Sequence, residues 1–224
     1  MTTLATRRFA ARSELDAALA ERLARALAAP GASAVMLSGG ETPMPAYHAV
    51  ARQGVRHDDR LHVLFTDERY VPEDSARSNY RQSSALLDVL ALPAESLLRV
   101  HTDRPLDEAA ADYDAQLAAL LSSGMHIALG LLGLGADGHT CSLFSSADLA
   151  RARGRYAIPV ERPDNLAAVS VTPELLATVR EPVFVVSEAG KEQAVRRLLA
   201  QDRTLTAWAA VQGCAHVELW VAAT

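Results

Sequence analysis

The residues with the clearest chemical potential in this sequence are an aspartate and a histidine in a glycine-rich turn. Asp137 and His139 belong to the segment Gly-Leu-Gly-Ala-Asp-Gly-His (133–139), which directly follows an apolar run. An imidazole titrates near neutral pH, and a carboxylate two residues away can orient it or raise its basicity. The pair therefore suits a general base that activates water. A structural, hydrogen-bonding histidine is the alternative interpretation.

A second segment has the composition of an anion-binding turn. The residues Ser-Gly-Gly-Glu-Thr-Pro (38–43) follow a short apolar run and precede a stretch that can form a helix. Glycines allow backbone N–H groups to converge on one point, and a helix N-terminus adds a partial positive charge, which together suit a phosphate. Gly39, Gly40 and Thr42 are therefore candidate phosphate-binding residues, with an ordinary tight turn as the alternative.

Charged side chains occur in one further cluster and at one isolated position. Thr-Asp-Glu-Arg (66–69) follows the apolar run 61–65, so three predicted strands end in polar residues, although a solvated loop is the alternative for this cluster alone. Lys191 is the only lysine among the 22 basic residues. A compact ammonium before a helix suits phosphate binding better than the planar guanidinium used everywhere else in the chain, unless chance explains its isolation.

The elements that must position these residues alternate between strands and helices. Apolar runs predict strands at 34–37, 61–65, 127–134, 156–160, 167–171, 183–186 and 216–221, and helical periodicity predicts helices at 13–29, from Pro43 or Pro45 through Val50, at 83–90, at 107–121 and from Lys191 through Leu199. Thr172-Pro173-Glu174 has the pattern of a helix N-terminus. Continuously apolar strands are typical of a parallel sheet covered on both faces, and such sheets bind ligands at the carboxyl ends of their strands.

Length, charge and cysteine content limit the class of protein. At 224 residues and 23.9 kDa, residues 1–224 fit a single α/β domain. The net charge of -5 argues against nucleic-acid binding. The two cysteines are too few for a disulfide framework, no secretory signal or long apolar span is visible, and we therefore predict a cytoplasmic protein that binds no membrane.

Rival chemistries have weaker support. Gly133, Gly135 and Gly138 match the dinucleotide fingerprint and Glu161 lies at a suitable distance, but polar residues follow where an apolar helix face is expected. A Gly-x-Ser-x-Gly elbow and a P-loop are both absent from the sequence. The histidines and cysteines show no metal-ligand spacing, so we predict neither a metal centre nor a cofactor.

Taken together, three motifs in order resemble the 6-phosphogluconolactonase family: Ser38 to Pro43, Thr66 to Pro72 with Ser-Asn-Tyr-Arg (78–81), and Gly133 to Phe144. Related glucosamine-6-phosphate deaminases carry Asp-Glu-Tyr and His-Ile-Ala-Phe in place of Asp-Glu-Arg and His-Thr-x-Ser-Leu-Phe. The resemblance implies a single-domain, Rossmann-like three-layer α/β sandwich with a mostly parallel central sheet. It also implies hydrolysis of 6-phospho-D-glucono-1,5-lactone without a cofactor. We further expect the protein to be a monomer or a weak homo-oligomer.

The resemblance also implies roles for particular residues. His139 would be the general base, Asp137 would hold its geometry, and Arg69 would stabilise the oxyanion or fix the substrate. The remaining candidates would bind substrate: Gly39, Gly40, Thr42, Asp67, Arg81 and Lys191. Which arginine meets the phosphate stays open, and a hexosamine-phosphate isomerase or deaminase and a non-catalytic sugar-phosphate sensor are the alternative functions.

Three positions depart from the family pattern. Glu41 stands where a serine or another non-acidic residue is common, and its carboxylate would repel a phosphate unless it turns outward. Cys141 replaces a usual alanine, and Ser145 replaces a usual proline. Of these, Glu41 is expected to matter most for phosphate affinity.

Overall fold

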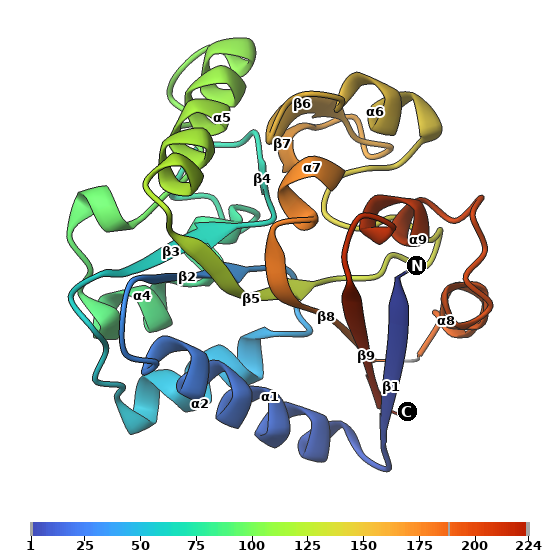
Figure 1. The fold of residues 1–224 in the computed structure, drawn as a ribbon, viewed down its shortest axis with the longest axis horizontal. Helices are drawn as coiled ribbons and strands as arrows, with labels where there is room; N and C mark the ends of the chain where they lie inside the picture. Colours follow the sequence, from blue (N-terminus) through green and yellow to red (C-terminus); the bar gives the residue numbers. More distant parts are fainter. Residues whose placement is uncertain (1, 188, 223–224) are drawn as a thin grey trace.

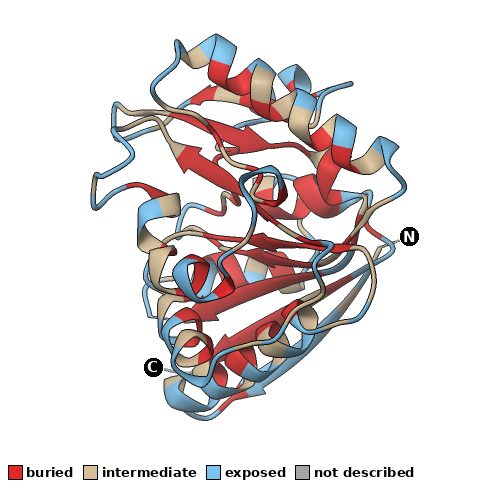
Figure 2. Ribbon diagram, turned by 90° about the vertical axis from the view of Figure 1, so that its left-hand side faces the viewer, coloured by how far each residue is buried: buried red, intermediate tan, exposed pale blue. Residues whose placement is uncertain are grey.

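A six-stranded, fully parallel sheet forms the centre of the fold in the computed structural model, which describes residues 2–187 and 189–222 (Figure 1). Its order is β1 (Thr3–Phe9), β9 (His216–Ala222), β8 (Val179–Ser187), β5 (His126–Leu132), β2 (Ser33–Leu37) and β3 (Leu61–Phe65). Along β2, Ala34 and Met36 belong to one hydrophobic core, whereas Val35 and Leu37 belong to the other. Both faces of the sheet are therefore covered, which explains the continuously apolar runs (Figure 2).

Helices form a layer on each side of this sheet (Figure 1). One side carries α1 (Arg12–Leu27), α2 (Met44–Gln53) and α4 (Ser84–Leu90), and the other carries α5 (Leu106–Ser122), α7 (Pro173–Leu176), α8 (Glu192–Leu199) and α9 (Thr206–Val211). In α1, leucines at positions 15, 19, 23 and 27 recur every four residues and are fully buried against the sheet. The predicted three-layer, Rossmann-like α/β fold is confirmed.

A small antiparallel sheet, which the sequence analysis did not predict, lies beside the large one. It contains β4 (Asp67–Arg69), β7 (Ala167–Val171) and β6 (Ala157–Glu161), in that order. The single residue Thr66 separates β3 from β4 and bonds to both sheets. Its N–H donates to the Leu37 carbonyl at 2.8 Å, and its own carbonyl accepts the Val171 N–H at 2.9 Å. The two sheets are therefore joined at one backbone position.

Two buried tyrosines fix the carboxyl ends of β2 and β3. The Tyr47 hydroxyl, from α2, donates to the Ser38 carbonyl at 2.8 Å and accepts the Ser38 N–H at 3.1 Å. Tyr113, from α5 on the opposite face, makes the same pair of contacts with Phe65, at 2.6 and 3.0 Å. Because burial disfavours a phenolate, it raises the pKa of both hydroxyls, which stay neutral. Backbone groups at the carboxyl ends of these two strands are thereby satisfied.

The predicted elements agree with the structure to within a few residues, apart from the longer β8. Thr172 caps α7 as predicted, and its hydroxyl accepts the Leu175 N–H. Several elements were not predicted from the sequence: β1, β4, α9 and the short elements α3 (Asn79–Gln82), η1 (Ala94–Ser96) and α6 (Ser146–Arg151). Within residues 2–187 and 189–222, the helices are all too short or too polar to cross a membrane.

Candidate active site

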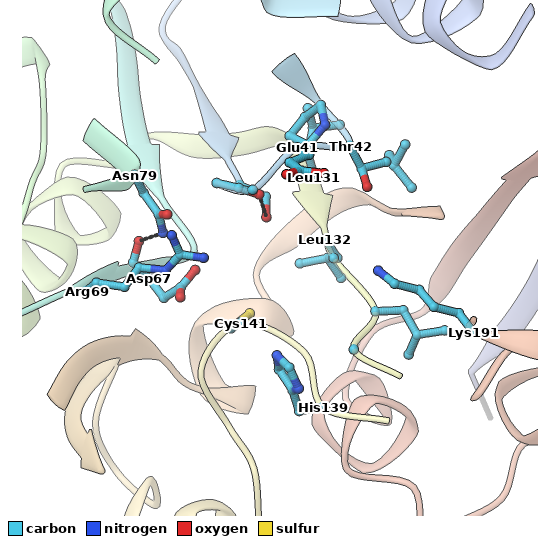
Figure 3. Close-up of a pocket in the computed structure, with 18 of the residues that line it drawn as sticks. Glu41, Thr42, Asp67, Arg69, Asn79, Leu131, Leu132, His139, Cys141 and Lys191 are labelled. Atoms are coloured by element: carbon cyan, nitrogen blue, oxygen red, sulfur yellow. Dashed lines mark hydrogen bonds between the residues drawn. The ribbon is translucent and has the colours of Figure 1, made fainter. Parts of the chain in front are cut away.

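A pocket of about 250 Å³ opens at the carboxyl ends of β2, β5 and β8, beside β4 (Figure 3). The chain leaves β2 for β3 on one side, whereas β5 pairs with β2 on the other, so the pocket lies where the connections change direction. Open parallel sheets bind ligands at this kind of position. Most of the predicted site residues line it: Gly39, Gly40, Thr42, Asp67, Arg69, His139 and Lys191.

Asp137 does not line the pocket itself, but it holds the histidine that does. Its Oδ1 lies 2.5 Å from His139 Nδ1 and also accepts the His139 N–H at 3.1 Å. Burial pushes the Asp137 pKa upward, but these hydrogen bonds from His139 outweigh it and leave the pKa below its ordinary value. An ionised carboxylate only accepts hydrogen bonds, so Nδ1 carries the proton and Nε2 keeps a free lone pair. That nitrogen can act as a base.

The glycines of this turn make room for the pair. A Cβ atom on Gly135 would lie 2.2 Å from His139 Nδ1 and 2.4 Å from Asp137 Oδ1. Gly138 has a φ of +90°, and its carbonyl accepts the Ala207 N–H of α9 at 2.9 Å. Gly133, by contrast, has neither a positive φ nor a close neighbour, so of these three glycines only Gly138 uses the left-handed backbone conformation that glycine permits.

The loop after β2 has the predicted glycine turn, with a different reason for each glycine. Gly40 has a φ of +85°. Gly39 is needed for space, because a Cβ there would lie 1.9 Å from Asn79 Oδ1. The Gly40 N–H donates to Gln82 Oε1 at 3.0 Å, so this predicted phosphate donor already has a partner. Within the described chain, no protein acceptor is assigned to the N–H groups of Gly39 and Thr42.

Basic groups gather at the Thr42 side of the pocket. Arg12, at the start of α1, donates from Nη2 to the Thr42 carbonyl at 2.7 Å. Lys191, just before α8, lines the pocket (Figure 3), and its pKa is lowered by burial and by the nearby Arg12 charge, against a smaller opposing effect of Asp137. A doubly charged anion placed here would relieve the repulsion between the two cations. Arg12 was missed because it lies 30 residues before Thr42 in the sequence.

Asp67 begins a chain of polar contacts that reaches a second missed residue. Its Oδ1 accepts the Thr66 hydroxyl and its Oδ2 accepts the Ser142 hydroxyl at 2.6 Å. Arg162 lines the pocket from the turn between β6 and β7, and its Nη1 donates to Ser142 Oγ at 3.1 Å. The Arg162 side chain is only 14% exposed, and its guanidinium lies 5.3 Å from the Phe144 ring centre. No local pattern in the sequence distinguishes this arginine from the others.

Two neighbouring residues of β4 point in different directions: Arg69 to the pocket and Glu68 to the start of α3. Arg69 lines the pocket, donates from Nη1 to the Arg77 carbonyl at 3.0 Å, and has a buried Nε without a partner among the described residues. The buried Glu68 carboxylate accepts the N–H groups of Asn79 and Tyr80 at 2.7 and 2.8 Å, at the start of α3. Burial raises the Glu68 pKa to about 7, despite these hydrogen bonds.

Arg81 is not among the residues that line the pocket, so its predicted substrate-binding role stays a prediction. It is exposed, and its Nη1 donates to Ser84 Oγ at 3.0 Å. The three departures from the family pattern are also placed. Glu41 is exposed at the pocket rim. Cys141 lines the pocket with its thiol pKa raised by burial and by Asp67, and Ser145 caps α6. A neutral thiol is a poor nucleophile.

The other chemistries considered from sequence find little support in this geometry. After Gly138 the chain forms further turns, and the next helix, α6, begins only at Ser146. A dinucleotide fingerprint should instead open directly into a helix, so the match is coincidental. Residues 2–187 and 189–222 contain no group of three or more His, Cys, Asp or Glu side chains suited to a metal ion.

Fold and pocket together define a doubly wound α/β protein whose pocket is lined by a histidine paired with an aspartate and by a glycine-rich loop. The chain belongs to the family of glucosamine-6-phosphate isomerases and 6-phosphogluconolactonases, whose sequence model matches residues 7–220. The predicted resemblance is thereby confirmed.

Individual relatives agree with this family. A 6-phosphogluconolactonase from Synechocystis is 36% identical over 193 residues, covering 81% of this chain and 77% of the relative. The crystal structure of the Thermotoga maritima 6-phosphogluconolactonase matches with a TM-score of 0.82 at 24% identity, covering 99% of this chain and 100% of the other. A monomeric glucosamine-6-phosphate deaminase also matches, with a TM-score of 0.81 at 15% identity and 97% coverage of both chains, so the fold is common to both activities.

Proposed function

We propose that this chain hydrolyses 6-phospho-D-glucono-1,5-lactone to 6-phospho-D-gluconate, the second step of the oxidative pentose phosphate pathway. The observation that carries this proposal is one pocket lined both by His139, whose ring Asp137 holds from outside the pocket, and by the loop at Gly39 with Lys191. A phosphorylated lactone needs a base for water and an anchor for its phosphate. The relatives named 6-phosphogluconolactonase support the choice of substrate.

In the first step, His139 Nε2 takes a proton from a water molecule while the water oxygen bonds to the lactone carbonyl carbon. The carbonyl π electrons move to its oxygen, which becomes an oxyanion. Asp137 keeps Nδ1 protonated and stabilises the imidazolium that forms. We assign the oxyanion to Arg69, whose buried Nε–H has no protein partner in the described chain, with the Arg162 guanidinium as a second positive charge in the same pocket.

In the second step, the carbonyl re-forms and the bond between its carbon and the ring oxygen breaks. The imidazolium gives its Nε2 proton to that leaving oxygen, which becomes a hydroxyl group of the open chain. The new carboxylic acid then ionises and releases one proton to solvent. His139 returns to its neutral form, so no cofactor is consumed in either step.

Binding of the phosphate is assigned to the basic side of the pocket. Gly39, Thr42 and Lys191 line the pocket, the N–H groups of Gly39 and Thr42 have no assigned acceptor in the described part of the chain, and Arg12 donates to the Thr42 carbonyl. Asp67 would accept a hydrogen bond from the sugar, in keeping with its predicted substrate-binding role. A single-domain, cytoplasmic protein that is monomeric or weakly self-associating remains a prediction, whose oligomeric part size-exclusion chromatography can check.

The test is hydrolysis of freshly generated 6-phosphogluconolactone, measured as acid release above spontaneous opening. His139→Ala should abolish the enzymatic rate, whereas His48→Ala, which changes an exposed histidine on α2, should retain it. Equal activity of both variants would contradict the assignment of the base. Ammonia release from glucosamine 6-phosphate would instead identify a deaminase, and binding of 6-phosphogluconate without turnover would identify a sensor.

A further inference from the structure

The side chain of Asn79 is the one buried polar group of the described pocket wall that presents an unpaired acceptor. Asn79 is 1% exposed, and its Oδ1 has no hydrogen-bond partner among the described residues, although the residue lines the pocket. Figure 3 shows the Asn79 side chain at the pocket wall beside Asp67 and Arg69, and its Oδ1 faces the Gly39 backbone. Because a buried amide oxygen without a partner is costly, such a group indicates a contact that a ligand completes.

The chemistry of the neighbouring groups fixes which end of the amide faces the pocket. Asn79 Nδ2 donates to the Asp67 carbonyl at 2.8 Å. Exchanging the amide oxygen and nitrogen would place two acceptors against each other, so this orientation is the favourable one. The group that Asn79 can offer to a ligand is therefore the acceptor Oδ1. An acceptor repels a phosphate dianion but suits a hydroxyl group.

The backbone around Asn79 is held rigidly enough for recognition. Its N–H donates to Glu68 Oε1 at 2.7 Å, and its carbonyl accepts the Ser83 hydroxyl at 2.9 Å. The side chain also fills the space beside Gly39, where even a methyl group could not fit. An acceptor fixed in this way loses little conformational entropy when it binds a hydroxyl group.

We propose that Asn79 is a specificity-determining residue whose Oδ1 accepts a hydrogen bond from one of the sugar hydroxyl groups of the lactone. Arg69, which lies beside Asn79 in Figure 3, has its unpaired Nε–H assigned to the oxyanion, so Asn79 Oδ1 is the unpaired group of this wall that remains for the sugar. A hydroxyl group both donates and accepts hydrogen bonds, so it is the group of the substrate that such a wall recognises. This inference rests on the proposed lactone hydrolysis and extends it to substrate selection.

The experiment compares the lactone with its three monodeoxy analogues, which lack the hydroxyl group at carbon two, three or four in turn. Wild-type enzyme should prefer the full lactone over one analogue by about tenfold to a hundredfold in kcat/KM, because that analogue leaves Oδ1 unpaired. Asn79→Ala should erase the preference for the full lactone over this one analogue and should leave its rates relative to the other two analogues as they are in the wild type. A crossed comparison of this kind isolates the single contact.

Gln82→Ala is the matched control, because Gln82 belongs to the same short helix and bonds to Gly40 but does not line the pocket. It should lower kcat/KM for all four substrates in parallel. The proposal is overturned if Asn79→Ala keeps every wild-type preference or lowers all rates in parallel, as the control does. If the alanine variant does not fold, the more isosteric Asn79→Leu takes its place.

A binding measurement separates this inference from the proposed function. Calorimetry compares 6-phosphogluconate with its three monodeoxy counterparts, for wild-type protein and both variants. If Asn79→Ala erases the binding preference against one analogue, the role of Asn79 is supported, whether or not the wild type hydrolyses the lactone. Absence of lactone hydrolysis by the wild type would overturn the hydrolase proposal alone. Turnover with no such loss of preference would overturn the role of Asn79 alone.

Discussion

The Oδ1 atom of Asp137 lies 2.5 Å from the Nδ1 atom of His139, and the same oxygen accepts the His139 backbone N–H. One carboxylate oxygen thus fixes both the ring and the backbone of the histidine. The Phe144 ring, 4.4 Å from the imidazole centre, limits ring rotation from another side. The Asp137 side chain remains 55% exposed, so its contribution comes from orientation and hydrogen bonding more than from a strong buried charge.

Asp137→Asn should lower kcat by about a hundredfold to ten-thousandfold with little change in KM, because a neutral amide neither holds the tautomer nor stabilises the imidazolium. Stopped assays of acid release measure both constants. Asp202→Asn removes a carboxylate that pairs with Arg197 on α8, away from the pocket, and should leave kcat unchanged. An Asp137→Asn enzyme with normal kcat would show that the carboxylate has no part in the reaction.

Gly135→Ala should reduce kcat by at least about a hundredfold, since the new Cβ would collide with both members of the pair. Gly130→Ala provides the contrast, because its Cβ would lie 2.8 Å from Met36 and 2.9 Å from Val179 in the core. That variant should lose thermal stability while its folded fraction keeps its kcat. Thermal melts measured beside the assay distinguish the two effects, and equal kcat losses would contradict this distinction.

Lys191→Ala should raise KM by about tenfold to a hundredfold and change kcat less, because a phosphate contact is shared by the ground state and the transition state. Lys191→Arg should recover part of the affinity. Arg196→Ala removes one exposed positive charge from the same helix and should leave KM near the wild-type value. A loss confined to kcat in Lys191→Ala would place the ammonium at the reacting carbonyl.

Glu41→Ser should lower KM about twofold to fivefold at low salt, since it removes a carboxylate from the rim of a pocket for an anion. The advantage should shrink as added salt screens the charge. Glu108→Ser, which removes an exposed carboxylate near the start of α5, should leave KM unchanged. A KM that rises in Glu41→Ser would mean that the carboxylate contributes a favourable contact to the substrate.

Glu68 should make folding stability depend on pH. Its pKa is about 7 in the folded protein, above the ordinary value of 4.5, so the folded state binds the proton more tightly. Its contribution to the free energy of unfolding is therefore fully present below pH 4.5 and is lost as the pH rises through 7. Urea titrations from pH 4 to 8 should show this loss, about 3 kcal/mol at most, in the wild type relative to Glu68→Gln. A relative stability that rises with pH would contradict it.

Much of the fold could be predicted because its signals are local. A strand buried on both faces has a continuously apolar sequence, and α1 repeats leucine every four residues. The start of α7 is signalled by two adjacent residues, the N-cap Thr172 and Pro173 at the first helical position. The exposed edge strand β1 has no such pattern, because only Phe9 of its residues is buried. The three residues of β4 are too few to show any period.

The candidate site was predicted where its residues are close in sequence and missed where folding brings them together. Asp137 and His139 are two residues apart, and the glycine loop is contiguous. Arg12 and Arg162 reach the site from α1 and from the turn of the small sheet, and no local pattern identified them. Arg81 has a suitable charge and sequence position, but α3 directs it outward, toward Ser84.

The backbone bonds of Thr66 to both sheets have a thermodynamic consequence. The glycine loop after β2 and the Asp137–His139 pair after β5 follow strands of the large sheet, whereas Arg69 and Arg162 come from the small sheet. A ligand that contacts both groups adds a second bridge between the sheets, parallel to the one through Thr66. We therefore expect occupancy of the pocket to make the sheets unfold as a more cooperative unit, so that saturating 6-phosphogluconate should sharpen the melting transition as well as raise its midpoint.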